Sequence, residues 1–203
     1  MLKTFNLNYK SNVFYSLKQY NSHYKLYNEF KINLNNYLFK KKIIYQHKYE
    51  LIDLIHDLSD VDKYQYINLL GGYLNHDYYF KNITFNKNLI FGNIKKIIEL
   101  NYTNFENLKL NFIKNFVNHI GWGWLVINKN KICLLKTKDN NNPMFSVSLG
   151  GFNSIPLIGI DLHEHSYYID YNSNKKKYIE NFLEFLNWYE IENRLQNYNL
   201  NLV

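Results

Sequence analysis

Histidines and one aspartate are the residues of this chain whose types and spacing could support chemistry. In the segment GIDLHEHSYY, residues 159–168, Asp161 and His165 lie four positions apart, directly after an apolar run. His76 lies far earlier, in the segment GGYLNHDYYF. A carboxylate together with several imidazoles is the ligand set of a redox-capable iron or manganese site. A structural hydrogen-bonded pair of Asp161 and His165 is the alternative that these residues leave open.

The first half of the chain is predicted to position these residues on helices. Aromatic and aliphatic residues recur every three or four positions over 22–40, which predicts a helix with one apolar face. A second helix is predicted over 62–81. The Gly71–Gly72 pair inside it is costly for a helix and therefore indicates the close approach of another backbone segment. We predict a further helix near 88–118.

The second half adds strands. Residues 122–139 contain two β-rich runs around Asn128-Lys129-Asn130, which predicts a hairpin. After a loop over 140–154, the segment IPLIGIDL (155–162) predicts another strand, and 175–198 predicts a long amphipathic helix. The predicted fold class is α+β, with an N-terminal helical hairpin followed by a C-terminal α/β domain that carries a small antiparallel sheet.

We divide the chain into a basic N-terminal arm (1–20), a helical hairpin domain (21–85) and an α/β C-terminal domain (86–203). The first acidic residue is Glu29. A basic start free of acidic residues is typical of a mitochondrial import segment, or of an arm that lies on an acidic partner.

Composition narrows the class of protein. The chain of 203 residues carries a formal net charge of +7, which favours an anionic partner such as RNA. Its single cysteine excludes a disulfide scaffold and a zinc ribbon. No run approaches the roughly 20 apolar residues that a membrane helix needs, so no membrane partner is expected.

Several motifs of the chain match those of one known family. Asp161, Glu164, His165, Tyr167 and Tyr168 fit the signature D-x-W-E-H-x-Y-Y, with His163 at the tryptophan position. The segments 121–125 (GWGWL) and 71–76 (GGYLNH) fit two further motifs. In these motifs the chain resembles the iron/manganese superoxide dismutases. The resemblance implies the same order of a helical hairpin and an α/β domain.

The resemblance also implies a metal site of three histidines and one aspartate. His76, Asp161 and His165 fall on three of these positions. Counted back along the first helix, the fourth position falls on Ser22, with His23 one residue away. One residue turns a helical side chain by about 100°. We therefore expect a vestigial metal site, with Ser22 or His23 at the missing ligand position.

The surroundings of that site depart from the family. The resemblance places the gateway tyrosine at Phe30, the gateway histidine at Leu26 and the solvent-binding glutamine near Asn140. Two pocket tryptophans fall on Phe80 and His163. Because outer partners tune a metal and Phe30 and Leu26 deliver no proton, we predict no catalytic residues and no cofactor.

These losses lead us to predict a non-catalytic, structural superoxide-dismutase-like protein of the mitochondrial ribosomal small subunit. Its expected partners are ribosomal proteins and rRNA. Glu164 and Tyr168 fall on dimer contacts of the family, and Leu26 removes the histidine that would bind the tyrosine. A heterodimer with another superoxide-dismutase-like subunit is therefore expected. The alternatives are a divergent but active dismutase with iron or manganese, and a metal-binding protein without turnover.

Overall fold

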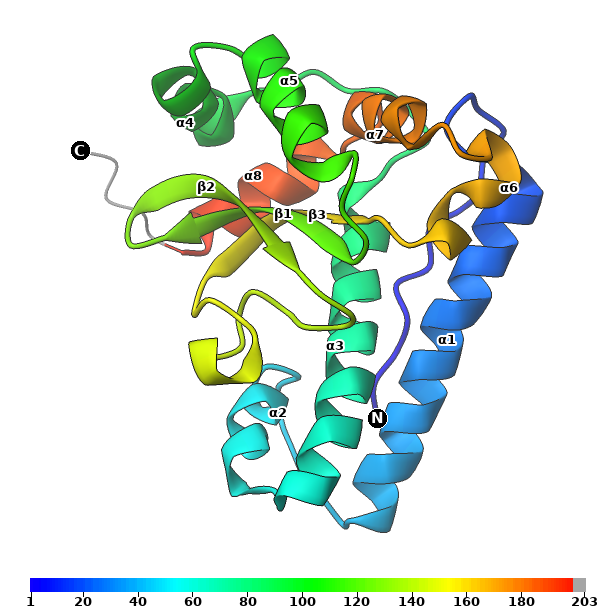
Figure 1. The fold of residues 1–203 in the computed structure, drawn as a ribbon, viewed down its shortest axis with the longest axis vertical. Helices are drawn as coiled ribbons and strands as arrows, with labels where there is room; N and C mark the ends of the chain where they lie inside the picture. Colours follow the sequence, from blue (N-terminus) through cyan, green and yellow to red (C-terminus); the bar gives the residue numbers. More distant parts are fainter. Residues whose placement is uncertain (199–203) are drawn as a thin grey trace.

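Two long antiparallel helices form the first part of the computed structural model, which describes residues 1–198 (Figure 1). They are α1 (Leu17–Lys40) and α3 (Asp60–Asn82). Each begins at a serine whose hydroxyl accepts a hydrogen bond from a backbone N–H of the first turn, Ser16 for α1 and Ser59 for α3. The connection between them contains α2 (Glu50–Asp53) and the 3-10 turn η1 (Leu54–Asp57).

The middle of α3 is the centre of the molecule. Every residue from Leu70 to Phe80 is buried, because α3 lies between α1 on one side and the sheet on the other. A Cβ atom on Gly71 would lie 1.8 Å from the backbone oxygen of Asn140. The close backbone approach predicted from the Gly71–Gly72 pair is therefore present, and it fixes the 140–154 loop against α3.

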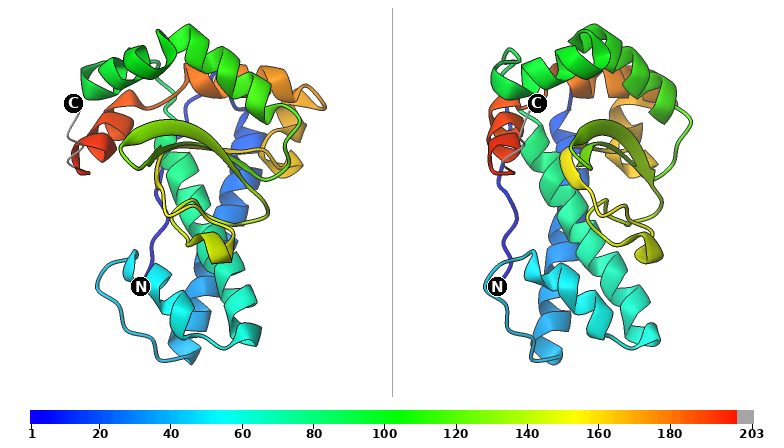
Figure 2. Two further views of the ribbon diagram at one scale, coloured as in Figure 1. Left: turned by 60° about the vertical axis from the view of Figure 1, so that its left-hand side comes forward. Right: turned by 90° about the vertical axis from the view of Figure 1, so that its left-hand side faces the viewer.

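The second part is a three-stranded antiparallel sheet in the order β2-β1-β3. Its strands are β1 (Trp122–Asn128), β2 (Lys131–Thr137) and β3 (Ile155–Asp161). Lys129 and Asn130 join β1 to β2 with positive φ angles of 47° and 64°, the backbone of a tight hairpin turn. α3 and α8 contact β3, and α5 contacts β2, so helices cover the sheet on both faces (Figure 2).

The remaining elements are short: α4 (Gly92–Tyr102), α5 (Phe105–Phe116), η2 (Val147–Leu149), η3 (Glu164–Ser166), α6 (Tyr168–Tyr171), α7 (Lys175–Glu184) and α8 (Trp188–Gln196). Two predicted helices are each divided in the structure. The helix near 88–118 breaks at Thr103, whose φ is +71°, and Asn104 caps α5. The helix over 175–198 breaks where Leu186 forms a bridge with Ile83 and Asn187 caps α8.

The segment before α1 is part of the core. It runs along the helical hairpin (Figure 1), and its residues Leu2, Phe14 and Tyr15 are buried. The boundaries predicted at residues 20 and 85 stay predictions. The predicted fold class is confirmed: a helical N-terminal region precedes an α/β domain with a small antiparallel sheet. Among the helices of residues 1–198, we find none with the length and apolar character of a membrane span.

Candidate metal centre

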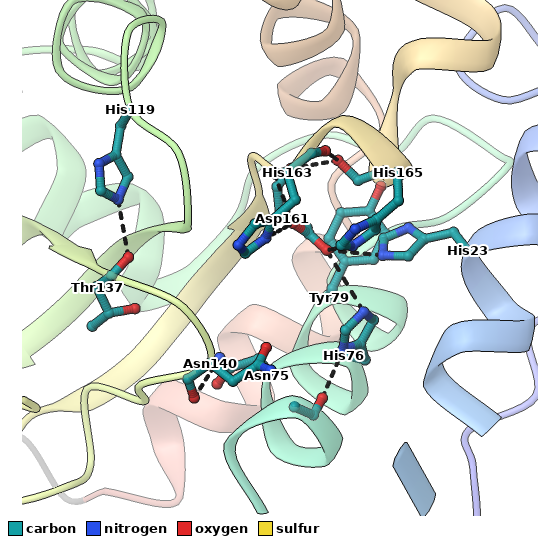
Figure 3. Close-up of polar contacts among 12 residues, drawn as sticks. His23, Asn75, His76, Tyr79, His119, Thr137, Asn140, Asp161, His163 and His165 are labelled. Carbon is teal, nitrogen blue, oxygen red and sulfur yellow. Dashed lines mark hydrogen bonds and ion pairs between the residues drawn. The ribbon is translucent and has the colours of Figure 1, made fainter. Parts of the chain in front are cut away.

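Four side chains from separate segments of the chain meet between α1, α3 and the end of β3 (Figure 3). They are His23 of α1, His76 of α3, Asp161 at the end of β3 and His165 in η3. One nitrogen or oxygen atom from each lies within 4.8 Å of the others. The first three residues are buried, and the side chain of His165 is 39% exposed.

Local structure aims these groups at one point. Asp161 ends β3 opposite Trp122 of β1, at the sheet edge that faces α3. The chain then turns, because Asp161 Oδ1 accepts a hydrogen bond from the backbone N–H of His163 at 3.0 Å. This turn starts η3 and returns His165 to the same carboxylate.

A single oxygen atom, Asp161 Oδ2, is the focus of the cluster. It lies 3.0 Å from His23 Nε2, 2.9 Å from His165 Nε2 and 3.6 Å from His76 Nε2. The last distance is too long for a hydrogen bond. Three imidazole nitrogens therefore face one carboxylate oxygen.

The protons of His23 can be assigned from its neighbours. The Tyr15 hydroxyl donates to the backbone oxygen of Ser166 at 2.6 Å. A hydroxyl has one proton, so its contact with His23 Nδ1 at 3.0 Å requires Nδ1–H to be the donor. His23 Nε2 then carries a lone pair and faces Asp161 Oδ2, which is also an acceptor. This geometry suits a cation that is bound by both His23 Nε2 and Asp161 Oδ2.

In His76, too, the proton is on Nδ1 and the lone pair is on Nε2. Its Nδ1–H donates to the backbone oxygen of Gly72 at 2.6 Å, because a carbonyl can only accept. Its Nε2 lone pair points into the cluster. Within residues 1–198, Nε2 is one of four buried side-chain polar atoms without a hydrogen-bond partner. A buried polar atom without a partner calls for an explanation, and a bound ion is one.

Burial and charge keep the cluster ready for a cation. Burial lowers the pKa of His76 to about 3, and it also lowers the pKa of His23, so both imidazoles are neutral at pH 7. Burial alone would raise the pKa of Asp161, but the charge on His165 and the hydrogen bonds of His163 and His165 hold it well below its usual range. Burial opposes the charge on His165, yet the nearby Asp161 carboxylate raises the pKa of this imidazole.

The residues present fit a manganese or iron ion. Such an ion prefers imidazole nitrogen and carboxylate oxygen, and the cluster presents three of the first and one of the second. Two of the nitrogens have lone pairs fixed by their outer hydrogen bonds, as ligating histidines require.

His23, and not Ser22, is the first-helix residue in the cluster. Ser22 is exposed on α1, whereas His23 is buried. Counting back along the first helix without a shift places the ligand position on Ser22. The structure places it one residue later, on His23, the other residue considered. The spacing of His23, Tyr27, Phe30 and Leu34, at steps of four, three and four, puts His23 on the inward stripe and is the signal that could have identified it.

Phe30 lies beside the cluster, whereas Leu26 does not contribute to it. The Phe30 ring is 5.3 Å from the His76 ring and fills the space next to Gly72, where a Cβ atom would lie 2.4 Å from it. Leu26 is partly buried on α1. Phe30 is thus an apolar wall of the site.

Asn140 lies outside the cluster (Figure 3). Its side-chain amide donates to Asn68 Oδ1 at 2.7 Å, at the surface. Its backbone oxygen accepts from Asn75 at 3.3 Å. Asn140 therefore anchors the 140–154 loop on α3 and does not supply an amide to the cluster.

Two contacts of the cluster do not follow from the predicted site residues. Tyr15 reaches His23 from the segment before α1, and no motif signals this. His163 was considered only as a replaced tryptophan, but its Nδ1 lies 2.8 Å from Asp161 Oδ1. The D-x-H spacing after a strand was the available signal, since an aspartate commonly bonds the residue two positions on.

Glu164 and Tyr168 are both exposed, next to His165. Their side chains are open to a second chain, and the predicted dimer contact stays a prediction. The mitochondrial location and the heterodimer partner also stay predictions.

The sequence comparisons identify the family. Residues 91–194 match the model of the iron/manganese superoxide dismutases, C-terminal domain. Superoxide dismutase [Mn] of Buchnera aphidicola subsp. Baizongia pistaciae is 32% identical over 151 residues, which cover 73% of this chain and 72% of the relative. Superoxide dismutase [Mn] of Escherichia coli (strain K12) is 29% identical over 143 residues, covering 70% and 69%. This chain belongs to the iron/manganese superoxide dismutase family.

These findings correct two predictions. The relatives are named superoxide dismutases, so the prediction of a non-catalytic pseudoenzyme of the mitochondrial ribosome is wrong. The expectation of no cofactor is wrong as well, because the relatives are named for manganese and the donor cluster has four members. Both errors rested on a missing ligand at Ser22 and on the replaced residues around it.

Proposed function

We propose that this protein is an active superoxide dismutase whose cofactor is manganese, held by His23, His76, Asp161 and His165. The observation that carries the proposal is the convergence of one donor atom from each residue within 4.8 Å. When bound, the ion would supply one-electron redox chemistry, through which two superoxide anions and two protons become dioxygen and hydrogen peroxide.

The protein's own residues bind the ion, orient the ligand atoms and enclose the site. His23 and His76 offer lone pairs at Nε2 because Tyr15 and the Gly72 carbonyl hold their other ring nitrogens. Asp161 supplies the negative charge that offsets a cation. The partly exposed His165 forms the side of the cluster that solvent reaches.

Aromatic rings exclude water from the other sides of the cluster. Phe80 lies 5.2 Å from the His23 ring, and Trp122 and Phe30 lie 5.1 Å and 5.3 Å from the His76 ring. The formal net charge of +7 favours the approach of a small anion. Both features support a reaction on superoxide.

The choice of manganese follows the names of the relatives. The same donors suit iron, so iron is the alternative metal. The test is to refold the protein with one equivalent of manganese or of iron and to measure superoxide removal against the metal-free protein. We expect activity only after loading, and higher activity with manganese.

Protein that takes up metal and removes no superoxide would overturn the proposal and leave a metal-binding protein without turnover. A control with His119→Gln should retain activity, because His119 is bonded to the Thr137 backbone oxygen, away from the cluster (Figure 3).

A further inference from the structure

Within residues 1–198, the second oxygen of Asp161 accepts hydrogen bonds from one residue. Oδ1 accepts two hydrogen bonds, from the backbone N–H of His163 at 3.0 Å and from its ring at Nδ1, 2.8 Å away. The three imidazoles described above face Oδ2. The two oxygens therefore have separate partners, and among the described residues His163 alone bonds to Oδ1.

The ring nitrogen of His163 must be the donor in this contact. A carboxylate that offsets a bound cation is ionised, and an ionised carboxylate only accepts, so Nδ1–H donates to Oδ1. The His163 ring also stacks on the ring of His165, with centroids 5.2 Å apart and planes 11° apart. One side chain thus contacts both the carboxylate and an imidazole of the cluster (Figure 3).

We propose that His163 is a positioning residue for the metal ion: its Nδ1–H fixes the rotation of the Asp161 carboxylate and withdraws charge from it. This inference rests on the proposed function. A carboxylate held at Oδ1 keeps Oδ2 directed at the imidazole nitrogens. A hydrogen bond to the same carboxylate weakens it as a donor, which favours the reduced ion over the oxidised ion.

Ring stacking is the competing explanation, and two variants separate it from the hydrogen bond. His163→Phe keeps an aromatic ring against His165 and loses the donor. His163→Asn places an amide N–H at the position of Nδ1 and loses the ring. His163→Leu is a second variant without a donor, to be used if the phenylalanine variant does not fold. His119→Gln controls for the loss of an imidazole outside the cluster.

The readouts are manganese affinity by competition with a chelator, the reduction potential of the loaded protein and the electron paramagnetic resonance spectrum of its Mn(II) form. We expect His163→Phe to lower affinity about tenfold, at the weak end of the ~10–100-fold range for outer partners, because the backbone N–H remains. Its reduction potential should fall and its spectrum should change. His163→Asn should stay within about twofold of the wild type in affinity, with a nearly unchanged potential.

Two results would overturn the inference. In the first, His163→Phe matches the wild type in all three readouts. In the second, the pattern is reversed, so that His163→Asn is impaired and His163→Phe is not, which assigns the effect to stacking. A wild-type protein that binds no metal would instead overturn the proposed function and this inference with it.

Discussion

Two buried aspartates of this protein each lie at the centre of a cluster of polar side chains, and the two clusters differ in kind. Asp77 follows His76 directly on α3, is 3% exposed, and accepts from the Tyr27 hydroxyl at 2.7 Å and from Lys81 at 3.1 Å, with Lys48 as a third partner. Asp161 is fully buried among imidazoles. The chain itself neutralises the first carboxylate.

The comparison shows that a buried carboxylate does not by itself indicate a metal. Burial would raise the pKa of Asp77, but Lys48 and Lys81 hold it below its usual value, and every contact has a defined donor. Around Asp161 the buried imidazoles are neutral, and lone pairs of His23 and His76 face inward. The first cluster is complete without a cation, whereas the second is suited to one.

The largest effect is expected from replacing each aspartate by asparagine. Asp161→Asn removes the negative charge shared by three imidazoles, so manganese affinity should fall by more than about 100-fold, beyond the range for outer partners. Superoxide removal should be lost with it. Asp77→Asn should retain both the manganese affinity and the superoxide removal of the wild type, per folded molecule. Equal losses in the two variants, measured by chelator competition and a superoxide assay, would abolish the distinction between the clusters.

Asp77→Asn should instead lower the stability of the fold. Removing one partner of a buried ion pair costs about 3–5 kcal/mol, and Lys48 and Lys81 are partly exposed, so they can return to water and reduce the cost to about 2–3 kcal/mol. Urea unfolding of the metal-free proteins measures this. A change below about 0.5 kcal/mol would mean that the Asp77 cluster does not hold α3 to its neighbours.

Acid should affect the two clusters at different pH values. The pKa of His76 is lowered to about 3 in the fold, against about 6.5 in the unfolded chain. The unfolded chain therefore binds the proton first, and stability is lost as pH falls from about 6.5 toward 3, by up to ~1.4 kcal/mol per pH unit. Asp77, whose pKa is lowered, contributes stability that is present above about 3.9 and is lost as pH falls through its folded value.

The check is urea unfolding of metal-free protein at pH 7.5 and 5.5. His76→Gln should reduce the loss of stability between these two values, and Asp77→Asn should leave it unchanged. His165 acts in the opposite sense, because its pKa is raised and its contribution is lost as pH rises through the folded value. A loss that is the same in His76→Gln and the wild type would contradict the assignment of His76 as a buried neutral imidazole.

The smallest effect is expected at Ser22. Because this side chain is exposed on α1, Ser22→His should change manganese affinity by less than about twofold, within the ordinary variation of surface substitutions. The matched variant His23→Ser should lose binding. A gain of tenfold in Ser22→His would show that α1 can rotate to present this residue.

Local patterns were sufficient to predict most of the fold. The period of α1, the glycine pair of α3 and the turn at Lys129 and Asn130 each depend on neighbouring residues. The breaks at Thr103 and at Leu186 did not follow from periodicity, because a positive φ angle and a distant bridge to Ile83 cause them.

The site was predictable only in part. Asp161 and His165 share one turn of chain, so their proximity follows from spacing. His23 differs from Ser22 only by helix rotation, which a motif count does not determine. The contact of Tyr15 with His23 depends on how the segment before α1 packs, and this is a property of tertiary structure.

The central claim is that His23, His76, Asp161 and His165 hold one metal ion. The most direct test is elemental mass spectrometry of the natively purified wild-type protein, with Asp161→Asn as the control. We predict close to one equivalent of manganese or iron per folded chain in the wild type and almost none in the variant. A wild-type chain that is metal-free as purified, and stays so after refolding with either metal, would contradict the account.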